Sequence, residues 1–469
     1  LASPHSTLEE LYLLQKLVRG LGSGNVDFRL RQSDFALDGK RRGAPWLGMR
    51  LAEIGTLDRV LVVGSFLRKD HPLIAQRLRG AAKKGLQLNL VHASADDLLM
   101  PVRHRATVAP GAFVNLMAQV VVAAAEIKGV SIESALQPQI AAVAIGNDAR
   151  RIAESLTSGT KPAVFLGNLA QNHPQAAMLH VLGLELARIV GGSFGFLGEA
   201  ANSVGGYIAG ALPDGPSDGL SASAMVKQPR KAYLVLHADP GLDCFDPVAT
   251  RAALRSAESV IVMSAFKTED LEYADCLLPV SPFTETAGTF VNTEGRIQSF
   301  NGVVKSLADA RPAWKVFRVL GNMLGLPGFD FETIEAVRAE VLASEPNAFS
   351  ARTDNAVDGI DIDLGLGPKG LQRVPDVPAY AADPLVRRAP SLQKTRDALP
   401  VAAAMNGEQA LSLGLSAGDP VVVRLGSGEA RLLVAVDETV PPGCVKVAAA
   451  LMATANLGPM FGIVTVERA

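Results

Sequence analysis

Short continuous apolar runs alternate along much of the chain with longer segments whose apolar residues recur at helical spacing. Runs of the first kind are typical of parallel strands buried on both faces, and segments of the second kind are typical of the helices that connect them. The predicted strands are 58–65, 86–92, 162–167, 231–238, 259–266 and 274–280. The predicted helices are 8–18, 71–85, 148–158, 174–190, 247–256, 312–324 and 332–342. This alternation predicts two or more doubly wound α/β layers.

The pattern changes in the last third of the chain. Residues 355–390 are dense in Pro, Gly and Asp, which is typical of a solvated linker. Asp358, Asp361 and Asp363 lie close together there, but the spacing lacks the final bidentate Glu of a calcium loop. Beyond residue 401, short β-type runs with Gly and Pro between them predict a small closed β-domain, and these runs are 421–425, 429–436, 444–447 and 463–466.

These patterns divide the chain into four parts. We expect a first α/β domain over 1–145 and a second over 146–345, which chain upstream of residue 1 would complete. A linker over 346–400 and a β-barrel cap domain over 401–469 would follow.

Composition excludes several classes of protein. The formal net charge of -2 offers no excess of cations for nucleic-acid phosphates, so we expect no nucleic-acid partner. The three cysteines are far apart, which excludes a disulfide framework and fits a reducing compartment. No charged segment precedes an apolar core at the first residue, so no signal peptide is predicted and the chain is interpreted as part of a longer one.

Two apolar windows could be mistaken for membrane spans. The window 445–466 contains Lys446 and Pro459, and the window 113–125 contains Asn115 and Gln119 and is short. Because polar groups and helix breakers are costly at bilayer depth, neither window is predicted to cross a membrane. Membrane contact is expected only through partner proteins.

Motifs of common catalytic and binding sites are mostly missing from the sequence. There is no nucleophile elbow and no phosphate-binding P-loop, and the glycine-rich stretch 192–206 has the spacing of a close-packing loop. His173 and His180 lie two helical turns apart, about 10 Å, which is too far for one metal ion. His71 is interpreted as a cap or surface residue.

The remaining thiols and carboxylates have structural interpretations too. The cysteines are interpreted as small buried side chains. Asp239, Asp243 and Asp246 are interpreted as parts of a strand-to-helix loop. The loops after Val63 and Leu90 are where an α/β sheet would bind a ligand.

One loop has more polar content than a connector needs. Residues 284–298, TETAGTFVNTEGRIQ, predict a short strand through Phe290 and Val291, a reversal, and a second strand. The run resembles the Gly-Thr-Phe-x-Asn-x-Glu-Gly-Arg-x-Gln motif that lies beside the pterin cofactor in the molybdopterin oxidoreductase family. The resemblance extends over about residues 3–466, and 404–425 is similar to that family's C-terminal cap domain, a barrel.

The resemblance implies a fold and a candidate cofactor site. The fold is α/β, with Rossmann-like layers of the molybdopterin oxidoreductase type and a small C-terminal β-barrel. The residues that match the family's pterin contacts are Gly288, Thr289, Asn292, Glu294 and Gly295. No catalytic residue and no metal ligand is assigned.

Within this family, four segments look most like the large peripheral-arm subunit of bacterial NADH–quinone oxidoreductase, respiratory complex I. They are 3–23, 64–85, 284–298 and 386–395. That resemblance implies a scaffold without an active site, partnered by the other peripheral-arm subunits on the cytoplasmic side of the inner membrane. Iron–sulfur clusters would lie upstream of this chain.

Departures from the family pattern favour loss of the pterin cofactor. His92, Ala93 and Ser94 replace the Asp-Pro-Arg contact that usually follows the second strand, and no cysteine stands where the molybdenum-ligand loop is expected. Glu294 and Arg296 would then only stabilise their loop, by local hydrogen bonds and an ion pair.

Two other interpretations stay open. The chain could be a working molybdopterin-dependent oxidoreductase acting on formate or a small oxyanion. It could also be a module that binds another nucleotide at a strand-end crevice. Metal content separates the first from the scaffold, and nucleotide-dependent thermal stability separates the second.

Overall fold

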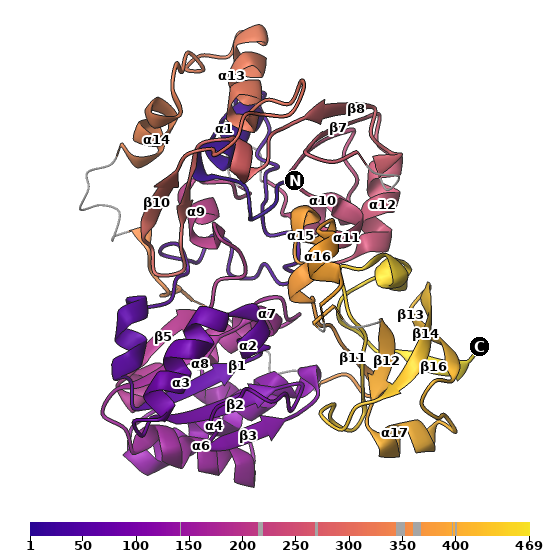
Figure 1. Ribbon diagram of the computed structural model, residues 1–469. Coiled ribbons are helices and arrows are strands. Elements are labelled where there is room, and N and C mark those ends of the chain that lie inside the picture. The colour runs from indigo at the N-terminus through magenta and orange to yellow at the C-terminus, as the bar shows by residue number, and fades with distance from the viewer. Residues whose placement is uncertain are drawn as a thin grey trace.

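The computed structural model describes residues 1–140, 142–213, 219–267, 271–343, 352–359, 367–395, 397–398 and 401–469. Figure 1 shows three parts: a sheet with helices on both faces at lower left, a second α/β part above it, and a C-terminal β part at lower right. Asp361 and Asp363, which sequence analysis placed in a linker, lie outside the described residues.

The first part is built on a five-stranded parallel sheet with the order β3-β2-β1-β4-β5. Its strands are β1 (Arg59–Val63), β2 (Gln87–His92), β3 (His104–Thr107), β4 (Pro162–Leu166) and β5 (Ser193–Phe196). The connecting helices are α2 (Leu67–Asp70), α3 (Pro72–Ala82), α4 (Phe113–Lys128), α5 (Gln137–Ile140), α6 (Asn147–Thr157), α7 (Asn168–Gln171) and α8 (Ala176–Val190). Three of the strands were predicted from the sequence, and β3 and β5 were not.

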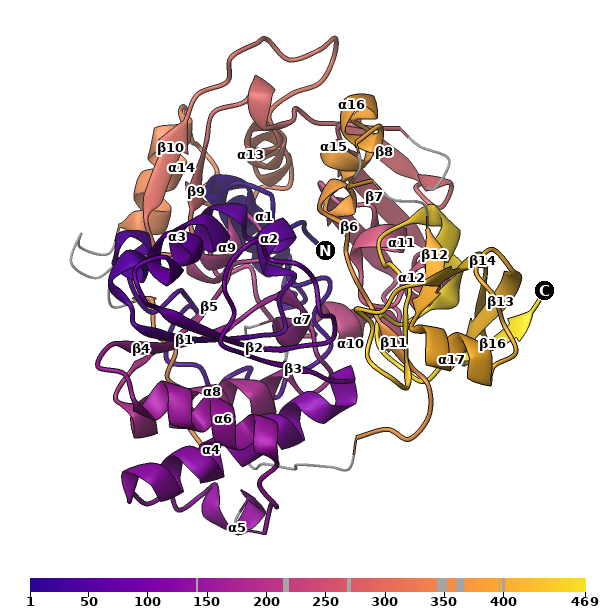
Figure 2. The ribbon, with the colours of Figure 1, turned by 60° about the horizontal axis from the view of Figure 1, so that its bottom comes forward.

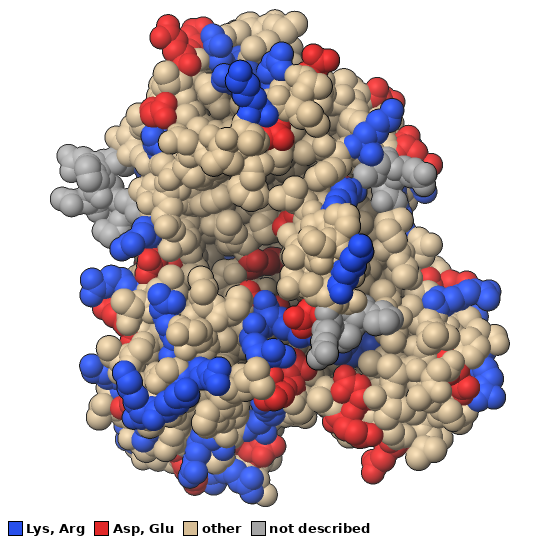
Figure 3. Space-filling view, in the orientation of Figure 1, with Lys and Arg blue, Asp and Glu red and all other residues tan. Residues whose placement is uncertain are grey.

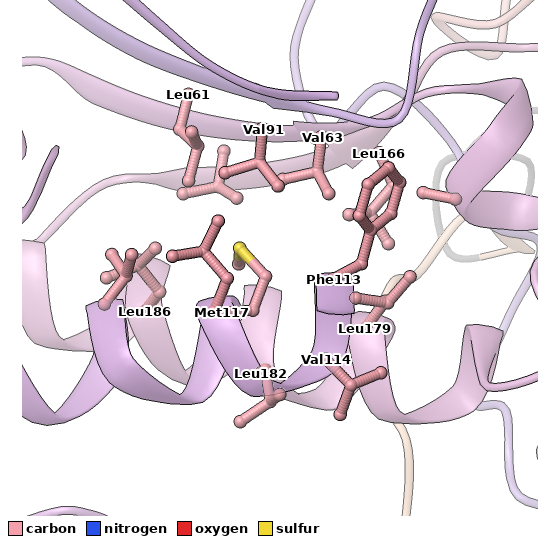
Figure 4. Close-up of a cluster of buried hydrophobic side chains, with 14 of the residues drawn as sticks. Leu61, Val63, Val91, Phe113, Val114, Met117, Leu166, Leu179, Leu182 and Leu186 are labelled. Carbon is pink, nitrogen blue, oxygen red and sulfur yellow. The ribbon is translucent and has the colours of Figure 1, made fainter. Parts of the chain in front are cut away.

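Alternation of side chains explains why this sheet is buried on both faces. In β1, Val60 and Val62 pack with α3, while Leu61 and Val63 pack with α4 and α8. Figure 2 shows α4, α6 and α8 below the sheet and α3 above it. Figure 4 shows Phe113 and Met117 of α4 pointing at the strand side chains.

The segment Pro110–Lys128, which contains α4, is long and apolar enough to cross a membrane, but most of it is buried inside the protein. Phe113, Met117 and Val121 are fully buried against the sheet and its neighbouring helices. Its apolar composition therefore has a sufficient explanation as a core helix.

The second part contains a three-stranded parallel sheet with the order β6-β7-β8, formed by β6 (Ala232–Leu236), β7 (Ser259–Ser264) and β8 (Cys276–Pro279). Its helices are α1 (Leu8–Gly20), α9 (Ser203–Ile208), α10 (Ala222–Lys227), α11 (Pro240–Asp243), α12 (Pro247–Arg255), α13 (Ala313–Met323) and α14 (Ile334–Leu342). α1 begins with the predicted capping signal, because Thr7 and Glu10 each accept a hydrogen bond from the other's backbone N–H.

The loop singled out in the sequence is a hairpin. β9 (Gly288–Val291) pairs antiparallel with β10 (Ile297–Phe300), and the Gly295 amide donates to the Asn292 carbonyl across the turn. The predicted strand and reversal are confirmed.

The C-terminal part is a six-stranded sheet with the order β11-β15-β12-β14-β13-β16. Its strands are β11 (Gln372–Val374), β12 (Ala402–Met405), β13 (Pro420–Leu425), β14 (Gly428–Val436), β15 (Cys444–Lys446) and β16 (Thr465–Arg468). The short helices of this region are α15 (Pro384–Arg387), α16 (Pro390–Gln393) and α17 (Gly407–Ser412). A further bridge joins Gln372 of β11 to Ile463, just before β16.

Two expected domain boundaries fall inside these sheets. Strands on both sides of residue 145 belong to the five-stranded sheet, because β4 inserts beside β1. β11, which lies within the expected linker 346–400, pairs with β15 of the C-terminal sheet. Chain order therefore does not follow spatial order here, and the four-part division itself stays a prediction.

Candidate functional site

After the neighbouring strands β1 and β4, the chain turns toward opposite faces of the first sheet. The helices that follow β1 pack on one face with Val60 and Val62, and the helix α8 that follows β4 packs on the other. Such a divergence opens a crevice at the carboxyl ends of the two strands.

Two glycines let the strand ends approach closely at this point. A Cβ atom on Gly167 would lie 2.3 Å from the Cβ atom of Ser65 and 2.6 Å from the Gly64 carbonyl oxygen. A Cβ atom on Gly64 would lie 2.6 Å from the Ala170 amide nitrogen, and Gly64 has φ +63. Larger residues at either position would force these strand ends away from the segments packed against them.

The first crevice has a volume of about 280 Å³, and its lining combines polar and apolar side chains. Lys69, Asp70, Asn168 and Asn172 line it from the strand ends, and Pro375 lies opposite them in the chain that leads from β11. The pKa of the Asp70 carboxyl is raised well above its usual value, first by burial and then by the nearby Asp376.

A second crevice of about 250 Å³ lies at the carboxyl ends of β6 and β7. His237 and Ser264 come from the two strand ends, and Phe266, Phe283 and Phe290 make much of its wall. At its base, His237 Nε2 lies 3.4 Å from a Glu10 carboxylate oxygen. His237 lowers the pKa of Glu10 against the opposing effect of burial.

The two crevices meet. His5 and Asp383 line both of them. Figure 3 shows the molecule hollowed where its three parts come together. Burial lowers the pKa of His5, and the neighbouring Asp383 opposes that shift.

A buried ion network borders this junction. Asp243 accepts from Arg31 at 2.9 Å and from Arg387 at 2.8 Å, and Asp239 accepts from Arg388 at 2.7 Å. Burial raises the pKa of Asp243 and the two guanidinium groups oppose that shift. The interpretation of Asp239 and Asp243 as loop residues therefore holds, with the addition that they fasten the segment 386–395 to the second part.

The five residues predicted as pterin contacts lie in the hairpin, outside the linings of both crevices. In β9, a Cβ atom on Gly288 would lie 2.4 Å from a methyl carbon of Thr7. The Thr289 amide and hydroxyl donate to the buried Glu9 carboxylate at 2.9 and 2.6 Å. Burial raises the pKa of Glu9, and the bonds from Thr289 oppose it.

The turn of the hairpin is bonded to the protein itself. The Asn292 side-chain oxygen accepts from the amides of Glu294 and Arg296, at 3.1 and 2.9 Å. Glu294 accepts from the Leu51 amide at 2.6 Å and lies 3.6 Å from the Arg296 guanidinium. Gly295 has φ +80. The second crevice is lined by the neighbouring Thr286 and Phe290 and by none of the five predicted residues. Their assignment as cofactor contacts therefore stays a prediction.

Of the two strand-end loops predicted as ligand sites, the one after Val63 lines the first crevice. The other turns toward the C-terminal part, where the Ala95 amide donates to the Thr439 carbonyl. His92 lies buried with its ring edge-on to Phe66, and neither ring nitrogen has a hydrogen-bond partner among the described residues. Burial lowers the pKa of His92 to about 4.

Other candidate residues are structural. His173 and His180 are buried, and each has Nε2 beside a backbone carbonyl, of Pro110 and Asn355 respectively. Among the residues that the structure describes, no group of three His, Cys, Asp or Glu side chains is arranged to hold a metal ion.

Two sequence interpretations are wrong. Cys276 is exposed, because it lies in β8 at the end of its sheet, whereas Cys244 and Cys444 are buried as predicted. His71 is buried and makes no capping hydrogen bond, because Pro72 begins α3 directly after it and the His71 side chain packs inward.

Sequence reasoning missed His5, Lys69, Asp70, Asn168, Asn172 and Asp383. The available signal was Gly64 and Gly167, each directly after a continuous apolar run and followed within a few residues by polar side chains. His5 and Asp383 carried no local signal, since only the tertiary fold brings them together.

The crevices fit a ligand of nucleotide type. Ser65 Oγ and Asn168 Oδ1 at the two strand ends are buried and have no hydrogen-bond partner in the described part of the chain. Buried polar groups normally have partners, so these atoms offer bonds to a bound group. The aromatic wall of the second crevice suits a flat ring.

The chain belongs to the molybdopterin oxidoreductase family, whose profile matches residues 1–323. It is similar to the F420-dependent formate dehydrogenase 1 subunit alpha of Methanococcus maripaludis, with 25% identity over 428 residues, 76% of this chain and 62% of the relative. The F420-dependent formate dehydrogenase subunit alpha of Methanocaldococcus jannaschii is 24% identical over 416 residues, 74% of this chain and 60% of the relative. The chain thus spans about three fifths of the length of these relatives.

The fold resembles that of acetylene hydratase from Pelobacter acetylenicus. The TM-score is 0.61 at 13% identity, over 97% of this chain and 82% of the hydratase. At this identity the likeness concerns the fold alone. It agrees with the predicted α/β architecture of the molybdopterin oxidoreductase type.

These findings correct the resemblance to complex I. The relatives above are formate dehydrogenase subunits and the structural neighbour is a hydratase, so the identification as a peripheral-arm subunit of NADH–quinone oxidoreductase is contradicted. The scaffold function, the peripheral-arm partners and the electron-transport role fall with it. The prediction of a lost pterin cofactor is also contradicted, because the chain matches a family of molybdopterin enzymes. The resemblance to complex I rested on four short segments, and similarity over most of the chain points to formate dehydrogenase subunits instead.

Proposed function

We propose that this chain is the molybdopterin-binding portion of an oxidoreductase that acts on formate or a small anion of the same kind. The observation that carries the proposal is the pair of crevices at the carboxyl ends of two parallel sheets, joined at His5 and Asp383. The formate dehydrogenase subunits among its relatives support the substrate class.

The chain's own residues divide the work of holding the cofactor. In the first crevice, Lys69, Asn168 and Asn172 would bind its polar groups, and close packing at Gly64 and Gly167 would hold the neighbouring strand ends in place. In the second, Phe266 and other aromatic rings would pack against a flat ring and exclude water. When bound, molybdopterin supplies a redox-active metal centre.

His5 is placed to handle a proton at the junction. Oxidation of formate to carbon dioxide releases two electrons and one proton. Because burial lowers the pKa of His5, its ring is neutral at pH 7 and able to accept that proton.

The C-terminal sheet would complete the site as a closed barrel. The bridge between Gln372 and Ile463 joins the two ends of the strand order, which supports closure. β11 begins the chain that passes over the first crevice, so the barrel would act as a cap. We also propose that the chain works with partner subunits, since its relatives are named as alpha subunits.

A dye-reduction assay tests this function. The chain, produced in a host that makes molybdopterin, should reduce an artificial viologen acceptor with formate, and His5→Gln should lower the rate while cofactor content is kept. Absence of formate-dependent reduction in a chain that carries the cofactor would contradict the substrate class.

A further inference from the structure

A third cavity, of about 550 Å³, lies apart from the two crevices and shares no lining residue with either. Its wall includes three arginines, Arg41, Arg42 and Arg352, together with Tyr207 of α9 and Leu212. No sequence motif marks it.

Backbone pairing between two distant segments assembles the arginines. The Ala44 amide donates to the Arg352 carbonyl at 2.6 Å, and the segment around Ala44 pairs with the segment that begins at Arg352. A Cβ atom on Gly43 would lie 2.7 Å from the Asp354 amide nitrogen, so the close approach depends on this glycine.

Some charges in the cavity wall are already neutralised. Arg42 Nε donates to the Asp358 carboxylate at 2.9 Å. Asp38, the acidic side chain among the described residues of the wall, accepts from Arg29 at 2.6 Å. These two pairs leave Arg41 and Arg352 as the remaining charged groups among those residues.

Neither of those two arginines has a carboxylate within ion-pair distance among the described residues. Among the described residues, Arg352 donates to the Val341 carbonyl, at 3.0 Å. Arg41 Nη1 lies 3.2 Å from His180 Nδ1, and its Nε is buried and has no hydrogen-bond partner in the described part of the chain.

His180, which lies beside Arg41, is not a counter-ion for it. Its Nε2 lies 2.7 Å from the Asn355 carbonyl, so Nε2 carries the proton and Nδ1 accepts from Arg41. Burial, and then Arg41, lower the pKa of His180 to about 3, which keeps the ring neutral. Two guanidinium groups in one cavity therefore carry charge without a counter-ion among the described residues, and a bound anion would compensate that charge.

We propose that this cavity is a binding site for the phosphate monoester of a small organic ligand, of the size of a nucleoside monophosphate. The charge of these two guanidinium groups, which have no carboxylate partner in the described part of the chain, matches one phosphate dianion. Guanidinium groups bind phosphate with two parallel hydrogen bonds. Tyr207 and Leu212 provide an aromatic and apolar wall for the organic portion.

Titration calorimetry with adenosine 5′-monophosphate, inorganic phosphate and adenosine tests the site. We expect saturable 1:1 binding of the monophosphate, weaker binding of inorganic phosphate and none of adenosine. Arg41→Gln and Arg352→Gln should each weaken binding of the monophosphate about 10-fold or more, because each removes a charge-assisted contact. Arg424→Gln, in an exposed ion pair of β13, is the matched control and should leave binding unchanged.

Equal binding of adenosine and its monophosphate would overturn the proposal, as would unchanged affinity in both arginine variants. If inorganic phosphate binds with the same affinity as the monophosphate, the proposal that the site recognises the organic portion of the ligand is overturned. Arg41→Lys keeps the positive charge and replaces Arg41→Gln in the titration if the latter variant does not fold. Weakened but measurable binding of the monophosphate by Arg41→Lys would support the site. The titration does not depend on molybdopterin, because the cavity is separate from both crevices, so its failure and that of the proposed function are distinguishable.

Discussion

At the scale of single residues, close approach and burial decide most of what this molecule can do. Gly64 and Gly167 allow close packing at the strand ends beside the first crevice, because any side chain there would meet neighbouring protein atoms. At Asp70, burial and the nearby Asp376 carboxyl raise the pKa and so disfavour the charged form of the side chain. Both features follow from the divergence of the chain after β1 and β4.

Replacing Gly167 should force apart the ends of β1 and β4 beside the first crevice. Gly167→Ala should cost about 1–3 kcal/mol of unfolding free energy, as overpacking does, and should lower pterin retention. Gly80→Ala is the control, since a Cβ atom on Gly80 in α3 meets nothing within 4 Å and should be neutral or slightly stabilising. Urea unfolding and pterin fluorescence measure the two effects, and equal behaviour of both variants would contradict the role of Gly167.

The turn of the hairpin allows a second test. Gly295→Val should lower the melting temperature, because a β-branched residue is strained at φ +80. Gly295→Asn should be tolerated better, since Asn adopts this conformation more readily. Calorimetry of both variants decides, and an unchanged melting temperature for the valine variant would argue against the turn.

Asp70 should make stability depend on pH. Its pKa is raised in the folded state, so its contribution is fully present below the unfolded pKa and is lost as pH rises through the folded value. Asp70→Asn should therefore be more stable than the parent at pH 8, with a smaller difference at pH 5. The Asn side chain can still accept from the Phe66 amide, as Asp70 does at 3.1 Å. Urea unfolding at both pH values checks this, and a pH-independent difference would refute it.

At the scale of elements, alternation of apolar runs with amphipathic segments predicted most of the long strands and helices of both α/β parts. The helix α4 was not predicted, because its nearly continuous apolar run lacks a clear amphipathic pattern. β1, β4, β6 and β7 are largely apolar runs, as is typical of strands buried on both faces, while β2 also carries Gln87, Asn89 and His92. β3 and β5 were missed because they are short and carry Arg105 or glycine within them. β12 was missed because an alanine-rich strand has little pattern of its own.

α4 is the element whose burial is most open to test. Phe113→Ala should cost about 3–5 kcal/mol, because it leaves a cavity between α4 and the sheet. Asn115→Ala, on the exposed side of the same helix, should change unfolding free energy by less than about 1 kcal/mol. Denaturant unfolding compares the two, and a small effect of Phe113→Ala would contradict the packing in Figure 4.

At the scale of the whole molecule, function depends on juxtapositions that no local pattern reveals. The two crevices share His5 and Asp383, which lie far apart in the sequence. The third cavity, with Arg41 and Arg352 in its wall, likewise brings together distant segments of the chain. The hairpin signature led to the right family, but the prediction that the cofactor is lost was wrong. The hairpin itself lies outside both crevice linings. The strand-end glycines were visible in the sequence, and their meaning required the order β2-β1-β4.

The most direct test of this account is the molybdenum, tungsten and pterin content of the purified chain, produced in a host that makes the cofactor. The account predicts pterin at close to one equivalent or more with its metal, and a marked loss in Gly167→Ala but not in Gly80→Ala. A well-folded chain that carries neither pterin nor metal would contradict the proposal that the paired crevices hold a working cofactor.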